Sequence, residues 1–300
     1  MKALVILNPA SGKKTAEPMR EAVNRRFNES QIDFKIYETK KEDNIGDIVG
    51  TLLKDKFDMV VAAGGDGTVS AVINGIVGTS IPLGIIPAGT GNLLAHELDV
   101  PLEIEDAVAL ITGTHNFKKI DVMRLGKQAY ILNISLGASA SVVSDTSPKN
   151  KKRFGRFAYV WTIVRKIFTL RQRYLTVSVD SKALKYRAIE VAIFNSGIIA
   201  KMLYPKGPNI RIDDGRLDVW IMGIQTILDY PRYLFEMVTG KPAKRLSHFI
   251  GAGKTVSIKS RIPLPVQADG DIIGTTPIEV EVMPAALTVL VAEKPVNAKA

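Results

Sequence analysis

One short run of residues carries most of the chemistry that this sequence suggests. Residues 60–68, VVAAGGDGT, place three glycines around one carboxylate and one hydroxyl at the end of an apolar segment. Glycines allow close backbone approach to a ligand and positive φ angles, and successive exposed N–H groups can bind an anion. We expect a helix over 69–77, whose N-terminus would favour negative charge at the same place. The pattern predicts a phosphate-binding loop, with a strained turn after an apolar strand as the structural alternative.

Two further strands are expected to end in loops of the same kind. Predicted strands over 3–7 and 81–86 run into 8–14, NPASGKK, and 87–92, PAGTGN. Ligands of an open α/β sheet bind beyond the carboxyl ends of its strands. We therefore expect all three loops to face one crevice.

Asp66 is the acidic residue of the first loop. Its carboxylate would repel bound phosphates unless a cation lay between them, so Asp66 is a candidate ligand of Mg²⁺. The structural alternative is an aspartate that accepts hydrogen bonds from its own turn. The hydroxyls of Thr68 and Thr90 are suited to phosphate. Further phosphate or ribose contacts are expected from Asn8, Ser11 and Gly12.

The first third of the chain alternates expected strands and helices. Strands over 3–7, 33–38 and 58–63 alternate with helices over 15–29 and 44–54. The alternation continues through a helix over 103–112. This order predicts an α/β domain with a parallel sheet and helices on both faces.

The remainder of the chain has a different pattern. After about residue 120 the segments are short and β-branched, which favours a mainly antiparallel β-sandwich, interrupted by a helix near 157–170. The expected strands are 129–136, 175–180, 186–195, 216–222, 254–259, 264–269 and 278–283, and a last strand near 287–292.

The three loops, taken with two acidic turns at 213–217, DDGRL, and 269–271, DGD, resemble the diacylglycerol kinase catalytic domain family. This family includes soluble bacterial lipid kinases, to which we assign the match, and the sphingosine and ceramide kinases. The resemblance implies an NAD kinase/diacylglycerol kinase-like fold. It has a nucleotide-binding α/β domain over 1–122, to which 287–294 returns, and a β-rich lipid-substrate domain over 123–286. The active-site crevice would lie between these domains.

The resemblance also implies the reaction. The enzyme would depend on ATP and Mg²⁺ and transfer the γ-phosphoryl group to a lipid hydroxyl, with diacylglycerol as the first expectation. Such a transfer needs a base for the hydroxyl proton. The family usually has Asp-Gly-Glu at the second acidic turn, with the Glu as the proposed base, and the matching residue here is Asp271, which is shorter by one methylene. A plain hairpin turn is the structural alternative, because Asp-Gly is a strong hairpin signal.

Other site residues follow from the resemblance position by position. Asp66 and Asp271 would be catalytic. A Mg²⁺ ion found in bacterial members would take the Asp214 carboxylate and the carbonyls of Arg211 and Arg216, although the flanking arginines oppose a cation. The nucleotide-binding residues would be Asn8, Pro9, Ala10, Ser11, Gly12, Thr39, Gly64, Gly65, Asp66, Gly67, Thr68, Val69, Ser70 and Thr90.

Composition and charge limit the partners. The chain has 300 residues, no cysteine and three scattered histidines, which excludes disulfides and thiolate chemistry and argues against a histidine metal site. A net charge of +10 favours an anionic partner such as a nucleotide, a nucleic acid or a membrane surface. No recognition motif supports nucleic acid. No signal peptide or apolar run of membrane-spanning length is evident, so we expect a cytoplasmic protein.

A basic cluster indicates where the protein could meet a membrane. Lys149, Lys151, Lys152, Arg153 and Arg156 precede the helix expected near 157–170, and such a segment suits anionic headgroups. The ordinary alternative is a helix packed on the β domain with solvated charges. We expect peripheral membrane association, and the sequence leaves a homodimer open.

Two rival functions share part of this pattern. NAD kinases carry a similar glycine–aspartate loop, but their usual Asn-Glu pair after it is Ser70-Ala71 here. A non-catalytic nucleotide- or lipid-binding regulator would fit that departure and Asp271. The segment 251–255, GAGKT, ends like a P-loop but has His248 where that motif needs glycine, so we expect a β turn there.

Overall fold

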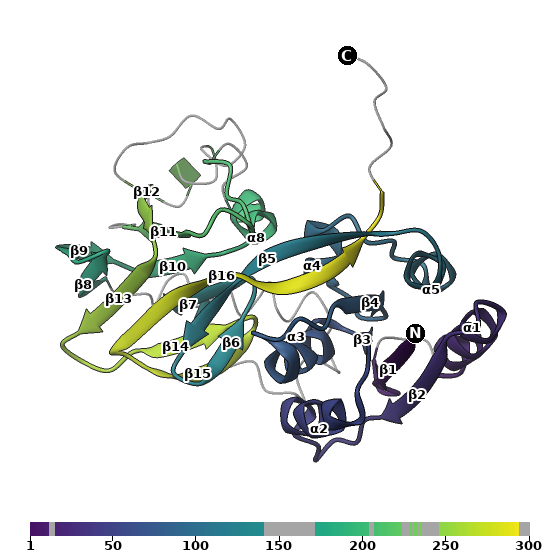
Figure 1. Cartoon of the computed structure of the whole chain (residues 1–300). Coiled ribbons are helices and arrows are strands. Elements are labelled where there is room, and N and C mark those ends of the chain that lie inside the picture. Colours follow the sequence, from purple (N-terminus) through teal and green to yellow (C-terminus); the bar gives the residue numbers. More distant parts are fainter. Residues whose placement is uncertain are drawn as a thin grey trace. The chain divides into compact units, whose positions relative to one another are not determined.

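The computed structural model describes residues 1–11, 16–140, 172–203, 207–223, 229, 231–232, 235 and 246–293. The chain divides into two compact units, Met1–Val122 with Pro284–Ala300, and Met123–Met283. Figure 1 labels the helices and strands. Gly12, the basic cluster at 149–156 and the helix expected near 157–170 lie outside the described residues.

The first unit contains a parallel sheet. Its strands are β1 (Lys2–Leu7), β2 (Asp33–Glu38), β3 (Met59–Gly64) and β4 (Leu83–Pro87). They are parallel in the order β2-β1-β3-β4, and Val289 of β16 (Ile278–Val291) pairs in parallel with Leu83. All of β3 is buried, as expected of a strand whose two faces are both covered.

Helices cover both faces of this sheet. On one face, α1 (Ala16–Glu29) and α5 (Ile104–Thr112) enclose a core with β1 and β3 (Figure 1). On the other face lie α2 (Ile45–Leu52) and α3 (Asp66–Ile76). A Cβ at Gly75 would lie 2.7 Å from the Gly46 carbonyl oxygen, so glycine allows α2 and α3 to pack closely. The short elements are η1 (Leu53–Asp55) and α4 (Leu93–Glu97).

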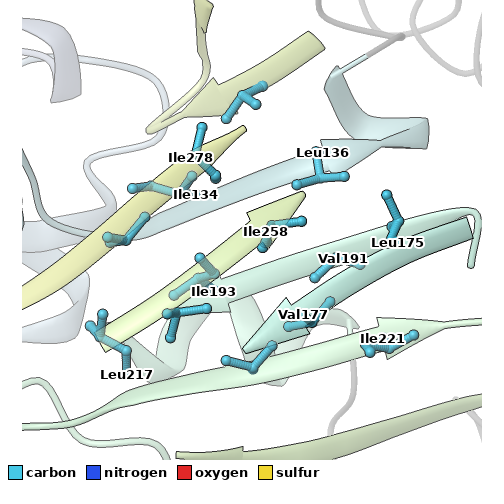
Figure 2. Close-up of a cluster of buried hydrophobic side chains, with 14 of the residues drawn as sticks. Ile134, Leu136, Leu175, Val177, Val191, Ile193, Leu217, Ile221, Ile258 and Ile278 are labelled. Carbon is cyan, nitrogen blue, oxygen red and sulfur yellow. The ribbon is translucent and has the colours of Figure 1, made fainter. Parts of the chain in front are cut away.

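The second unit contains two antiparallel sheets packed face to face. One sheet has the order β12-β11-β10-β7-β14-β15, and the other contains β16-β13-β8-β9. Figure 2 shows side chains from both sheets meeting in one apolar core. The strands are β5 (Asn116–Leu125), which begins in the first unit, β6 (Gln128–Tyr130), β7 (Asn133–Gly137), β8 (Arg173–Val179), β9 (Lys182–Ala188), β10 (Glu190–Phe194), β11 (Leu217–Met222), β12 (Ser247–Gly253), β13 (Thr255–Ser260), β14 (Pro265–Ala268) and β15 (Asp271–Thr275); the helix is α8 (Gly197–Leu203).

The predicted fold class, a parallel α/β unit with a mainly antiparallel β-sandwich, is therefore confirmed. The β turn expected at 251–255 is wrong, because these residues end β12 and begin β13, and only Lys254 lies between the two strands. There the Asp180 carboxylate accepts hydrogen bonds from the amides of Lys254 (2.8 Å) and Thr255 (3.0 Å).

Three predicted strand boundaries are wrong. The strand expected over 129–136 is divided into β6 and β7, because the amides of Ile131 and Leu132 donate to the Asp269 carboxylate. The strand expected over 186–195 is divided at Ile189, where the chain passes from one sheet to the other. The two strands expected after residue 277 are one strand, β16.

Candidate active site

The glycine–aspartate loop joins β3 to α3. Gly65 is the N-cap of α3, and its carbonyl accepts hydrogen bonds from the amides of Thr68 (2.9 Å) and Val69 (3.1 Å). Asp66 is therefore the first residue of the helix, three residues before the predicted start. Within the described part of the chain, the amides of Asp66 and Gly67 donate to no other atom. These two N–H groups and the helix dipole favour an anion at this end of α3.

The three predicted loops meet in the first unit. Asn8 Nδ2 donates to Thr68 Oγ1 at 2.9 Å, and the Gly65 amide donates to Ser11 Oγ at 3.3 Å. The Leu93 amide, just beyond the third loop, donates to Asp66 Oδ1 at 2.6 Å. Asp66 thus binds the neighbouring loop rather than its own turn. Its second oxygen, Oδ2, accepts from no donor among the described residues.

The glycines of these loops lack a Cβ where a neighbouring residue lies very close. A Cβ at Gly64 would lie 2.5 Å from Thr68 Oγ1, and one at Gly89 would lie 2.7 Å from the Gly65 Cα. A Cβ at Gly91 would lie 2.7 Å from Asp66 Oδ2. None of these glycines has a positive φ angle. The loops need glycine because they approach one another closely, and a larger residue would separate them.

The remaining predicted nucleotide residues differ in exposure. The buried ones are Ser11, Thr39, Gly64, Thr68 and Val69, the half-buried ones Asn8, Gly65, Asp66 and Ser70, and the exposed ones Pro9, Ala10, Gly67 and Thr90. Thr39 lies beside the end of β1, because its amide donates to the Leu7 carbonyl at 2.9 Å. Exposed residues are therefore present in the loops after β1, β3 and β4.

The second acidic turn is a two-residue hairpin in the second unit. Ala268 pairs with Asp271, and Asp269 and Gly270 between them have φ angles of 47° and 97°. Two positive φ angles are typical of a type I′ turn, for which Asp-Gly is preferred. Asp271 is exposed at the start of β15. Asp271 is thus a strand residue that is open to solvent.

Asp269 anchors this turn. Its carboxylate accepts hydrogen bonds from the amides of Ile131 (2.8 Å), Leu132 (2.9 Å) and Asn133 (3.1 Å). Burial raises the pKa of the nearby Tyr130 phenol above its ordinary value, and the charge on Asp269 and that on Asp271 act in the same direction. The charges of Asp269 and Asp271 therefore both lie close enough to Tyr130 to affect its pKa.

The first acidic turn, at 213–216, was the predicted metal position. Asp214 Oδ1 accepts from the Arg216 amide at 3.0 Å, and Arg211 Nε donates to Asp213 at 3.0 Å. Asp218 is half-buried, and burial together with the charge of Asp214 raises its pKa to about 6. The Asp214 carboxylate is exposed at this turn, and carboxylate and carbonyl oxygens are ligands that Mg²⁺ accepts. The described residues contain no cluster of three or more acidic or histidine side chains that could hold a metal.

The structure brings several predicted site residues together within the first unit. Asn8, Ser11, Asp66, Thr68 and the loop at 87–92 form one group in the first unit. The turns that carry Asp271 and Asp214 belong to the second unit.

Two contributors were not predicted from the sequence. Asn92 has a φ angle of 48°, and its Oδ1 accepts from the Gly89 amide at 2.9 Å. Asparagine tolerates this left-handed conformation, so the Gly-Thr-Gly-Asn pattern could have indicated it. The anchoring role of Asp269 has no local signal, because its partners lie more than 130 residues away.

Comparisons with known proteins identify the family. Residues 2–125 match the model of the diacylglycerol kinase catalytic domain. Residues 133–291 match the model of the YegS C-terminal NAD kinase beta sandwich-like domain. This second match alone covers more than half of the chain.

Individual relatives agree with these matches. A diacylglycerol kinase from Staphylococcus carnosus (strain TM300) is 27% identical over 281 residues, which cover 92% of this chain and 90% of the relative. An uncharacterized protein of Synechocystis sp. is 27% identical over 302 residues, covering 95% of this chain and 69% of that protein. The crystal structure of a diacylglycerol kinase from Bacillus anthracis str. Sterne has the same fold, with a TM-score of 0.73 at 22% identity over 96% of each chain.

The domain matches and the relatives named diacylglycerol kinase identify the chain as a lipid kinase. The chain belongs to the family of the YegS C-terminal domain and carries a diacylglycerol kinase catalytic domain over residues 2–125, so the predicted family and enzyme class are confirmed.

Proposed function

We propose that this lipid kinase transfers the γ-phosphoryl group of ATP to the free hydroxyl of diacylglycerol, giving phosphatidic acid. The observation that carries the proposal is the meeting of three strand-end loops around Asp66 at the N-terminus of α3. The name of the Staphylococcus carnosus relative supports diacylglycerol as the acceptor.

The nucleotide phosphates would bind where α3 begins. Among the described residues the amides of Asp66 and Gly67 have no acceptor, so they can donate to phosphate oxygens. Thr90 is exposed and offers a hydroxyl, whereas Thr68 is 4% exposed and its oxygen already accepts from Asn8. We therefore assign phosphate contacts to the backbone at 66–67 and to Thr90, and a positioning role to Thr68.

Asp66 would hold the Mg²⁺ that accompanies ATP. Its Oδ1 is fixed by the Leu93 amide, which leaves Oδ2 for a cation. Bound Mg²⁺ neutralises charge on the phosphates during transfer. The Asp214 carboxylate, with the carbonyls of Arg211 and Arg216, would hold a second ion at the turn before β11.

Asp271 would act as the general base. As the lipid oxygen attacks the γ-phosphorus, the carboxylate takes the hydroxyl proton and the bond to the β-phosphate oxygen breaks, releasing ADP. The Asp269 anchor would keep Asp271 in place, since it ties the turn to three backbone amides.

We also propose that the enzyme acts from the cytoplasm at an anionic membrane surface. The net charge of +10 supports this, as does the basic sequence at 149–156. In the described part of the chain, no helix combines the length and apolar composition of a membrane span.

One assay tests the proposed function. Purified protein is incubated with γ-labelled ATP, Mg²⁺ and, separately, diacylglycerol, other lipid alcohols and NAD. We expect label on diacylglycerol and none on NAD, and loss of labelling in Asp66→Asn, which keeps an oxygen for the Leu93 amide but removes the charge. Label on NAD alone, or nucleotide binding without transfer to any acceptor, would contradict the proposal.

A further inference from the structure

A chain of polar side chains crosses the second unit and ends at the acidic turn. Glu190, Ser135 and Gln267 are buried, with exposed fractions of 6%, 2% and 6%. They lie on one face of the sheet, because Ser135 is opposite both Gln267 and Ala192, and Glu190 is two residues from Ala192. Ser139, two residues after the end of β7, completes the set.

The distances define a continuous series of hydrogen bonds. The Gly270 amide donates to Gln267 Oε1 at 3.0 Å, and Gln267 Nε2 donates to Ser135 Oγ at 2.6 Å. Ser135 Oγ and Ser139 Oγ lie 2.7 Å apart. Ser139 then donates its hydroxyl and, at 3.0 Å, its amide to the two oxygens of Glu190.

Donor and acceptor roles fix the direction at both ends of this series. The Gly270 amide can only donate, so the oxygen of Gln267 faces it and the Gln267 nitrogen faces Ser135. Ser135 accepts from Gln267, so its own hydrogen points to Ser139 or directly to Glu190, and the Ser139 hydroxyl donates to Glu190. When Glu190 is ionised, both of its oxygens can accept the hydrogen bonds that Ser139 donates. When Glu190 is protonated, one of its oxygens carries a hydrogen that points toward a donor of Ser139.

We propose that Glu190 is a positioning residue for the general base: acting through Ser139, Ser135 and Gln267, its carboxylate fixes the turn that carries Asp271. The inference rests on the proposed role of Asp271 in lipid phosphorylation. Asp269 holds the turn from one side through the amides of 131–133, and the Glu190 series holds it from the other through Gly270.

The surroundings of Glu190 allow it to respond to pH. Burial raises the pKa of Glu190 to about 7, and hydrogen bonds from Ser139, Ser135 and the Ala138 amide oppose that rise. The residues opposite Glu190 on the adjacent strands are Gly137 and Met222, which do not titrate. On the same face of β11, the nearest described acidic residue is Asp218, opposite Phe194. The turn should therefore be held less firmly below about pH 7.

The test compares Glu190→Gln with Ser135→Ala in the full-length protein. Glutamine keeps the volume of Glu190, but its NH₂ group must face one of the two Ser139 donors. Alanine at 135 keeps the carboxylate of Glu190, removes one hydrogen bond to it and breaks the series in the middle. Ser257→Ala, on β13 of the other sheet, is the matched control for a serine lost from a strand.

Two readouts follow, and one needs no enzymatic activity. Hydrogen exchange at the Gly270 amide should be at least several-fold faster in both variants and unchanged in Ser257→Ala. With diacylglycerol as acceptor, kcat should fall about tenfold or more in both variants, while the KM for ATP stays near the wild-type value. The wild-type rise of kcat through about pH 7 should be absent from both variants.

A double variant decides whether Glu190 acts through the series. Glu190→Gln added to Ser135→Ala should have little further effect on kcat or on Gly270 exchange. Wild-type Gly270 exchange and kcat in a folded Glu190→Gln protein, or full additivity in the double variant, would overturn the inference. If the wild type phosphorylates no lipid while Gly270 exchange still depends on Glu190, the proposed function fails and the structural coupling stands.

Discussion

Replacing Glu190 with glutamine should change how the stability of the protein depends on pH. Glu190 is buried, and its pKa rises from an ordinary value of 4.5 to about 7 on folding. At low pH the residue is protonated in both states. Between about pH 4.5 and 7 the unfolded chain loses this proton while the folded protein keeps it, so folding becomes less favourable as pH rises.

The magnitude follows from the shift. A difference of about 2.5 pKa units, at 1.36 kcal/mol per unit, corresponds to a loss of about 3 kcal/mol in the free energy of unfolding between pH 4 and pH 8. Glutamine does not titrate, so Glu190→Gln should not lose this free energy. Relative to the wild type, the free energy of unfolding of the variant should therefore rise by about 3 kcal/mol between pH 4 and pH 8.

Urea unfolding of both proteins at pH 4, 5, 6, 7 and 8 measures this difference. Asp180→Asn provides a control of opposite sign, because hydrogen bonds from the amides of Thr255 and Lys254 lower the pKa of Asp180. The stability that ionised Asp180 contributes to the wild type is lost as pH falls, and Asp180→Asn lacks this contribution at every pH. A constant difference between wild type and Glu190→Gln from pH 4 to pH 8 would refute the reasoning.

Three other variants give distinct outcomes. Gly89→Ala should weaken ATP binding about tenfold or more, measured by calorimetry, because its Cβ would lie 2.7 Å from the Gly65 Cα; unchanged affinity would show that the loops need not meet. Asp269→Asn should lower the free energy of unfolding by about 2 kcal/mol, because one amide oxygen cannot serve three N–H groups as a carboxylate does; wild-type stability would contradict the anchoring role. Replacing Lys149, Lys151, Lys152 and Arg153 with Gln should strongly reduce binding to anionic vesicles and leave binding to neutral vesicles unchanged, by about 1 kcal/mol per charge; equal loss on both vesicle types would exclude a headgroup contact.

The sequence predicts most of the first unit, because its signals are local. Apolar strands such as β3 end directly in glycine loops, and the parallel order of the strands brings those loops to one edge. That Asp66 lies near the third loop follows from this reasoning. That its carboxylate binds the Leu93 amide does not, since the contact depends on the exact path of the loop after β4.

The second unit is less predictable, because its decisive contacts join distant residues. The break between β6 and β7 arises from Asp269, 138 positions beyond Ile131. Within the sequence, Glu190 is an ordinary acidic residue before a short apolar strand. Only the pairing of β7 with both β10 and β14 places it in the same buried series as Gln267.

The base assignment is the part of the account that a single measurement tests most directly. The turnover of diacylglycerol with labelled ATP is measured for wild type, Asp271→Asn and Asp271→Glu, with nucleotide binding measured separately. Asparagine keeps the shape of the side chain but cannot take the proton, so kcat should fall by about a hundredfold to ten-thousandfold while ATP affinity stays near wild type. Glutamate should retain or raise activity. A fully active Asp271→Asn, or one whose only defect is weaker ATP binding, would contradict the account.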